Sequence, residues 1–241
     1  MKLYQFNPIY MILGLRGAER SLVYLYYCGK DTREVMVQII QASDLSLHDV
    51  EKKFNLQLVE DEQFFREWQD DLPEVSDAEK QWLDRVKADF LSLRKYPLHE
   101  EIVKMVVLSP LLSLAGFFRY PFHPEAEVKV SAEDEGEVVR GKVDVLIVLE
   151  QFWVAVIETK NKQFSTGEAL PQALFYMMNN PNTSKPTYGL ATNGTEFLFI
   201  KLIRQDTPQY AESELFTLYR RRNELYEVLS ILKRLGELVG R

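Results

Sequence analysis

The sequence predicts a mixed α/β protein of the α+β class, because strand-like and helix-like stretches follow one another along one chain of 241 residues. The strand-like runs are rich in β-branched and aromatic residues, and Asn193-Gly194 is a typical hairpin turn between the last two of them. A chain of this length, with 46% hydrophobic and 27% charged residues, can bury a sizeable core. The predicted strands are residues 127–131, 138–149, 152–159, 187–192 and 195–203.

The predicted helices carry apolar residues at three- and four-residue spacing. An acidic, helical stretch spans residues 46–90, and Ser76-Asp-Ala-Glu79 is a capping box within it. A helix after Pro97 should be kinked at Pro110 and stopped by Gly116. Two further helices are predicted over residues 168–179, with Pro171 in the first turns, and over residues 224–239.

Composition excludes several classes of protein. The single cysteine, Cys28, rules out a disulfide framework and a zinc cluster of the Cys-x-x-Cys type. No apolar run is long enough to span a membrane and no signal peptide is apparent, so we expect a cytoplasmic protein. The net charge of −7 argues mildly against nucleic acid, although charge distribution matters more than the sum. Residues 1–35 show no clean period, and Met36 is an alternative functional start.

Asp144, Glu158 and Lys160 are the candidate catalytic residues. Asp144 is the only acid within the apolar run from Val143 to Leu149, where an unpaired carboxylate is costly. Side chains alternate along a strand, so Glu158 and Lys160 share one face while Thr159 points away. A hairpin between the two runs would bring Asp144 and Glu158 to one cation, whereas the alternative is a set of ordinary salt bridges at the rim of the sheet.

This set of groups suits Mg²⁺, with Mn²⁺ as a substitute. Mg²⁺ prefers oxygen ligands and retains several waters, so Asp144, Glu158 and the backbone carbonyl of Thr159 would leave room for a phosphate oxygen. A bound cation acidifies water and offsets charge that develops on phosphorus. Lys160 would orient the attacking water or stabilise the transition state.

Asp144 followed by Glu158-Thr159-Lys160 resembles the PD-(D/E)xK nuclease signature, with Val143 where that signature names proline. Gln172-Ala-Leu-Phe-Tyr176 is similar to the Q-x-x-x-Y motif of the RecB-like branch, which the R subunits of type I restriction enzymes share. The chain also resembles short stand-alone proteins of a cyanobacterial type named after those subunits. The resemblance covers about residues 97–202, and it implies a restriction-endonuclease-like core in which helices flank a central mixed sheet.

The resemblance implies an N-terminal helical or irregular appendage (residues 1–95), a nuclease core (96–206) and a C-terminal helical extension (207–241). The implied function is a Mg²⁺-dependent deoxyribonuclease. Because the chain has no Gly-x-x-x-x-Gly-Lys-[Ser/Thr] run, no ATP is expected. DNA is the expected partner, and a homodimer or other restriction-system subunits stay open. The alternatives are a catalytically inactive DNA-binding or adaptor protein that keeps the fold, and a structural protein whose acidic appendage binds a partner.

The remaining site residues each keep a second interpretation. The resemblance makes Glu101 a further metal ligand, but Glu100 could replace it and a solvated helix acid is the other interpretation. Gln172 and Tyr176 lie on one helical face, where they would reach the scissile phosphate, tie the helix to the strands, or simply pack. Cations that would contact DNA phosphates, or else lie solvated at strand ends, are Arg140, Lys142 and Lys162, and the triplet Arg220-Arg-Arg222 is a further basic candidate.

Overall fold

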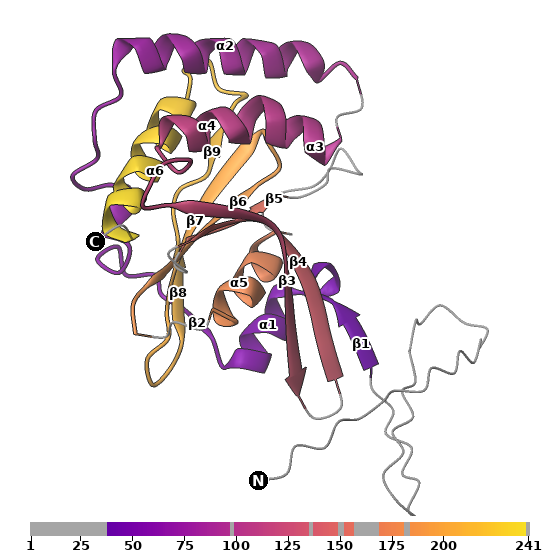
Figure 1. Ribbon diagram of the computed structural model, residues 1–241. Helices are drawn as coiled ribbons and strands as arrows, with labels where there is room; N and C mark the ends of the chain where they lie inside the picture. Colours follow the sequence, from indigo (N-terminus) through magenta and orange to yellow (C-terminus); the bar gives the residue numbers. More distant parts are fainter. Residues whose placement is uncertain are drawn as a thin grey trace, which may run out of the picture.

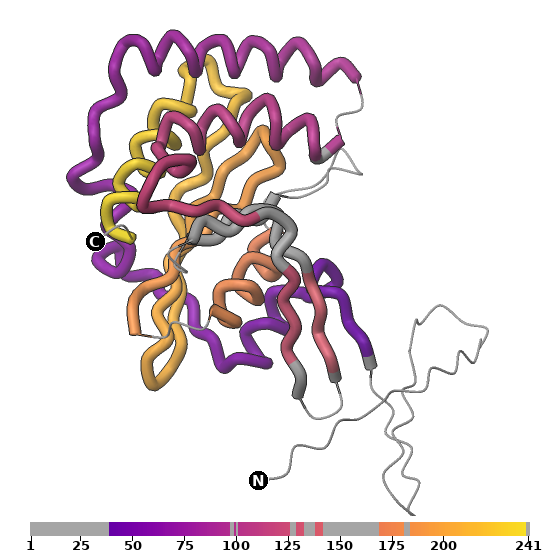
Figure 2. The backbone as a smooth tube through the Cα atoms, in the orientation of Figure 1, coloured from indigo at the N-terminus to yellow at the C-terminus, as the bar shows by residue number. Residues whose placement is uncertain are grey.

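The structure is a computed structural model that describes residues 38–96, 99–134, 137–148, 152–156, 169–180 and 184–239 (Figures 1 and 2). For residues 38, 100, 126–128, 133–134, 137, 142–148 and 152–156 it describes the backbone alone. The expectations for residues 1–35, for Met36 as a start and for Pro97 therefore lie outside the described residues.

The elements follow one another as an α+β arrangement, as the sequence predicts. In chain order they are β1 (Gln38–Gln41), η1 (Ala42–Asp44), α1 (Leu47–Phe54), β2 (Gln57–Leu58), η2 (Arg66–Trp68), α2 (Asp77–Leu93), α3 (Glu100–Val103), the π-helix η3 (Lys104–Leu108), α4 (Ser109–Leu114), β3 (His123–Asp134), β4 (Glu137–Val148), β5 (Phe152–Val156), α5 (Leu170–Met178), β6 (Thr187–Thr192), β7 (Glu196–Ile203), β8 (Gln209–Glu212), β9 (Phe216–Thr217) and α6 (Leu225–Val239).

All of these strands belong to one mixed sheet, in the order β1-β4-β5-β6-β7-β8-β2, with β3 on the other edge of β4 and β9 beside β7. The pairs β3–β4, β4–β5, β6–β7 and β7–β8 are antiparallel. The pairs β1–β4, β5–β6 and β2–β8 are parallel. The predicted hairpin between the two apolar strands is therefore confirmed as the antiparallel pair β4–β5.

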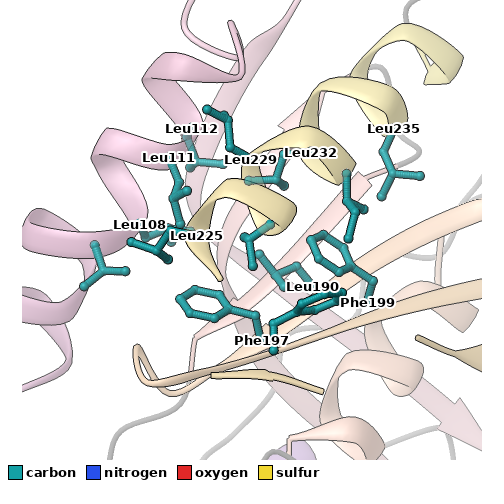
Figure 3. Close-up of a cluster of buried hydrophobic side chains, with 14 of the residues drawn as sticks. Leu108, Leu111, Leu112, Leu190, Phe197, Phe199, Leu225, Leu229, Leu232 and Leu235 are labelled. Atoms are coloured by element: carbon teal, nitrogen blue, oxygen red, sulfur yellow. The ribbon is translucent and has the colours of Figure 1, made fainter. Parts of the chain in front are cut away.

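Helices cover both faces of the sheet, so alternate residues of β7 enter two different cores. Phe197 and Phe199 pack with α4 and α6, as Figure 3 shows, whereas Leu198 and Ile200 pack with α1 and α5. The helices α2, α4 and α6 gather on the first face, and α1 and α5 lie on the second (Figure 1). Truncating a fully buried leucine such as Leu229 to alanine would cost about 2–5 kcal/mol.

The local signals in the sequence form as predicted. Ser76 and Glu79 make both hydrogen bonds of a capping box at the start of α2. Gly194 has φ +81° in the β6–β7 turn, a conformation that glycine adopts without steric cost. Pro171 occupies the first turn of α5. Ahead of Pro110 the helix contains a π turn, in which Ser109 N–H donates to the carbonyl of Lys104, whereas the kink at Pro110 stays a prediction.

Both of the expected appendages, residues 1–95 and 207–241, contribute strands to the sheet, and the expected division of the chain stays a prediction. β1 pairs with β4, and β2, which falls within the predicted helical stretch of residues 46–90, pairs with β8. Leu83, Val86 and Phe90 of α2 are buried in the first core. At the other end of the chain, β8 and β9 extend the sheet and α6 supplies much of that core. The physical reason is that these short segments bury apolar residues that could not be buried alone.

Candidate functional site

β4, the strand that carries Asp144, changes its partner on one edge just before this residue. β3 pairs along the other edge of β4 from Val148 back to Glu137. On the changing edge, the parallel pairs with β1 end at Arg140, and the antiparallel pairs with β5 begin at Val145. Asp144 therefore lies at the end of the interval, residues 141–144, over which this edge of β4 passes from the parallel strand β1 to the antiparallel strand β5.

The ring of Tyr176, a residue of α5, packs against Gly141, the residue at which that interval begins. A Cβ on Gly141 would lie 2.6 Å from Tyr176 Cε1, 2.7 Å from Tyr176 Oη and 2.7 Å from the Cβ of Ala42. Contacts this short do not occur between real side chains, so a side chain at position 141 would displace the tyrosine or η1. The absent side chain lets α5 and η1 approach the backbone of β4. Sequence reasoning missed this role of Gly141, since nothing in its local pattern names the ring that fills the space.

Gln172 and Tyr176, the two ends of the Q-x-x-x-Y match, bond to each other. Gln172 Nε2 donates to Tyr176 Oη over 2.7 Å, and Tyr176 is fully buried while Gln172 is half-buried. Their spacing of four residues places them on one face of α5. The tyrosine of this pair packs on β4 three residues before Asp144. Contact between Gln172 and a phosphate stays a prediction.

Glu101 lies exposed on α3, close to the end of the sheet at which β5 runs out. The side chain of Val103, two residues later, packs against Gly194 in the β6–β7 turn. Thr192, just before this turn, pairs with Val156, the last described residue of β5. Glu101 is exposed because Val103 and Val107 take the buried face of the helix, and its role as a metal ligand stays a prediction. The side chain of its neighbour Glu100 lies outside the described part.

Arg140 is exposed on the sheet and lies between polar neighbours on two strands. Its register partners are Ser131 of β3 and Gln41 of β1, which are also exposed. Two residues further along β4, Lys142 is the partner of the exposed Lys129. Residues opposite each other in antiparallel strands project on the same side, so Ser131 and Arg140 share a face. Lys129 was missed because its closeness to Lys142 depends on the register of β3 and β4.

The other predicted site residues are described in part or not at all. The backbone alone is described for Lys142 and Asp144, and Glu158, Thr159, Lys160 and Lys162 lie outside the described residues. Within the part of the chain that the structure describes, no three His, Cys, Asp or Glu residues are grouped so that they could hold a metal ion. The predicted ligand set is therefore an expectation from the sequence.

A separate buried polar network belongs to the architecture of the sheet. Lys201 Nζ lies 2.5 Å from Glu67 Oε1 and 2.6 Å from the carbonyl oxygen of Phe64. Tyr188 donates to the same carboxylate oxygen over 3.0 Å, and burial together with that carboxylate raises the pKa of the Tyr188 phenol. These interactions connect η2 to β6 and β7. They give Glu67, Tyr188 and Lys201 polar partners beside the first core, where a polar group without a partner would be costly.

Comparison with known proteins gave no matching family model and no matching curated protein. Among the described residues, none of the helices combines the length and apolar character that a membrane crossing requires.

Proposed function

We propose that the protein is a Mg²⁺-dependent deoxyribonuclease of the PD-(D/E)xK kind, acting in the cytoplasm on DNA phosphodiester bonds without ATP. The observation that carries this proposal is the contact of Tyr176 with Gly141, held by Gln172. It joins the Q-x-x-x-Y segment of α5 to β4, the strand of Asp144, four residues before the first pair of β4 with β5. This contact supports the proposal because α5 and β4, which lie far apart in the sequence, pack together.

The direction of β5 supports the same site. β5 is antiparallel to β4, so after Val154, which pairs with Val145, it runs toward the Gly141 end of β4. In the sequence Glu158 follows Val156 by two residues, and two residues of chain span at most about 7 Å. In this proposal Glu158 meets Asp144 at the end of the interval that begins at Gly141.

The donor types fit a hard divalent cation. In this proposal Asp144, Glu158 and the carbonyl of Thr159 hold Mg²⁺, with Glu101 at the rim, because carboxylate and carbonyl oxygens are the ligands it prefers. The bound cation would supply Lewis acidity toward a phosphate oxygen. Lys160 would hold the attacking water in line with the phosphorus, and Gln172 and Tyr176 would fix α5 against β4.

Several cations would hold the DNA strand beside this site. Arg140, Lys142 and Lys162 are assigned to phosphate contacts, and Lys129 joins them through its register with Lys142. Such contacts release counterions, so binding should weaken as salt is added.

The test incubates the protein with supercoiled, linear and branched DNA in Mg²⁺ without ATP. Asp144→Ala, Glu158→Ala and Lys160→Ala should each abolish cleavage, whereas Asp89→Ala, which removes an exposed acid of α2, should leave it intact. Mg²⁺ or Mn²⁺ should raise the melting temperature of the wild type, because a ligand of the native state stabilises it, and Glu158→Ala should remove that rise. DNA cleavage by purified Asp144→Ala protein would contradict the assigned site. DNA binding without cleavage and without a metal response would favour the adaptor alternative.

A further inference from the structure

A surface rich in arginine and tyrosine is formed by α2 and the loop from Tyr219 to Arg222, none of which carries a residue assigned to the proposed nuclease site. Lys87 of α2 donates from Nζ to the carbonyl oxygens of Arg220 at 2.7 Å and Arg222 at 2.8 Å. Glu224, which is buried, accepts from the backbone N–H of Thr217 and holds the other end of the loop. The loop is therefore fixed by main-chain contacts, and its arginine side chains extend from a defined backbone.

Aromatic rings are exposed on the same surface. The Arg94 guanidinium lies over the ring of Tyr219 at 5.4 Å from its centroid, and Tyr219 still exposes 60% of its surface. Tyr96, two residues beyond Arg94, is 69% exposed. Tyr219 therefore presents an exposed ring beside a guanidinium group, and Tyr96 adds a second exposed ring two residues along the chain from Arg94. Planar guanidinium and phenol groups are those on which nucleic-acid bases stack.

The surface carries more cations than carboxylates, in contrast to the protein's net charge of −7. Arg220 and Arg222 share the carboxylate of Glu224, yet their side chains stay 56% and 60% exposed. Arg94, Lys95 and Arg221 are exposed and form no salt bridge within the described part of the chain. The nearby acids are partly engaged: Asp84 accepts from Asn223 and Tyr226, and Glu227 pairs with Arg222. The remaining positive charge is complementary to a polyanion.

We propose that this arginine–tyrosine surface, formed by Lys87, Arg94, Lys95, Tyr96 and the Tyr219–Arg222 loop, binds single-stranded nucleic acid. Arg94, Lys95 and Arg221 hold backbone phosphates, and Tyr219 and Tyr96 stack with bases. A single strand fits better than a duplex, because its bases are free to lie on exposed rings while paired bases are hidden in the stack. The inference is independent of the proposed catalytic residues, and it would hold for a protein that cleaves nothing.

Fluorescence anisotropy with a fluorescein-labelled 20-nucleotide oligo(dT), in EDTA over a salt series, tests the surface. Tyr219→Ala should weaken binding about fivefold or more, the effect typical of removing an aromatic side chain on which a base stacks. Arg221→Ala should weaken it too, and should lower the slope of log affinity against log salt by about 0.7, the contribution of one phosphate contact on a single strand.

Matched controls isolate the surface from general effects of charge and ring loss. Arg85→Ala removes an exposed arginine from another side of α2, where it lines a groove with Met105. Tyr120→Ala removes a ring that is 97% exposed, far along the chain from both parts of the surface. Both variants should bind oligo(dT) like the wild type. The measurement is made in EDTA and follows binding, not cleavage, so failure here and failure of the nuclease proposal can be told apart.

Three results would overturn the inference. One is equal affinity of Tyr219→Ala and wild type, since no base would then stack on this ring. Another is an Arg221→Ala salt slope identical to that of Arg85→Ala. The third is competition by polyglutamate or by anionic phospholipid vesicles that is as strong as competition by unlabelled oligo(dT) at equal charge, because the surface would then bind anions of any kind.

Discussion

Replacing Gly141 by alanine should destabilise the protein through one identifiable clash. The new Cβ would lie at 2.6 and 2.7 Å from two atoms of Tyr176 and at 2.7 Å from Ala42 Cβ. Tyr176 is fully buried and its hydroxyl accepts from Gln172, so the ring cannot rotate into solvent to relieve the contact. The strain must therefore be taken up by a shift of α5 or η1 relative to β4.

The size of the effect follows from two opposing contributions. Overpacking of a close-packed core costs about 1–3 kcal/mol. Alanine in a strand interior regains about 0.5–1 kcal/mol relative to glycine, because it loses less conformational entropy on folding. The clash outweighs this gain, and the net loss should be about 1–2 kcal/mol. For a domain of this size, that corresponds to a melting temperature lower by about 2–8 °C.

Urea and thermal unfolding of Gly141→Ala, Tyr176→Leu and the double variant would measure the clash directly. Because leucine lacks the ring atoms that meet the new Cβ, the two substitutions should couple by at least about 0.5 kcal/mol. If Gly141→Ala is as stable as the wild type, or costs the same in the Tyr176→Leu background, Tyr176 does not occupy the space above Gly141. The role given to Gln172 and Tyr176 in joining α5 to β4 would then fail as well.

Two other perturbations test the packing around the sheet. Lys201→Met should lower the free energy of unfolding in urea by about 2–4 kcal/mol, because it leaves the mostly buried carboxylate of Glu67 without its cation. Arg66→Ala, which breaks an exposed ion pair, should lower it by under about 1 kcal/mol. Equal losses in the two variants would contradict the difference in burial. Hydrogen bonds, the strongest of them from Tyr226, hold the pKa of Asp84 below its usual value. The ionised carboxylate therefore stabilises the fold at a pH above the usual pKa, and this stabilisation is lost as the pH falls through the lowered pKa. Tyr226→Phe should therefore lower the urea midpoint more at pH 7 than at pH 3, and a loss independent of pH would refute this linkage.

The sequence by itself determined the elements whose signals are local. The capping box at Ser76, the Asn193-Gly194 turn and the apolar face of α6 each stabilise their element through residues a few positions apart. The pair β4–β5 was predictable for the same reason, because two apolar runs were separated by a short polar connection. The candidate catalytic residues were found as a motif, which depends on residue types and spacing alone.

Only the tertiary structure decided the contacts between segments that lie far apart in the sequence. The parallel strands β1 and β2 have four and two residues, so no local pattern distinguishes them from loops, and they form because β4 and β8 present unpaired edges. The contact of Tyr176 with Gly141 spans 35 positions, and the register of Lys129 with Lys142 depends on how β3 and β4 align. The loop of Tyr219 is likewise fixed by Lys87, far away in the chain. Such contacts are set by the joint packing of many elements, and spacing along one sequence does not encode them separately.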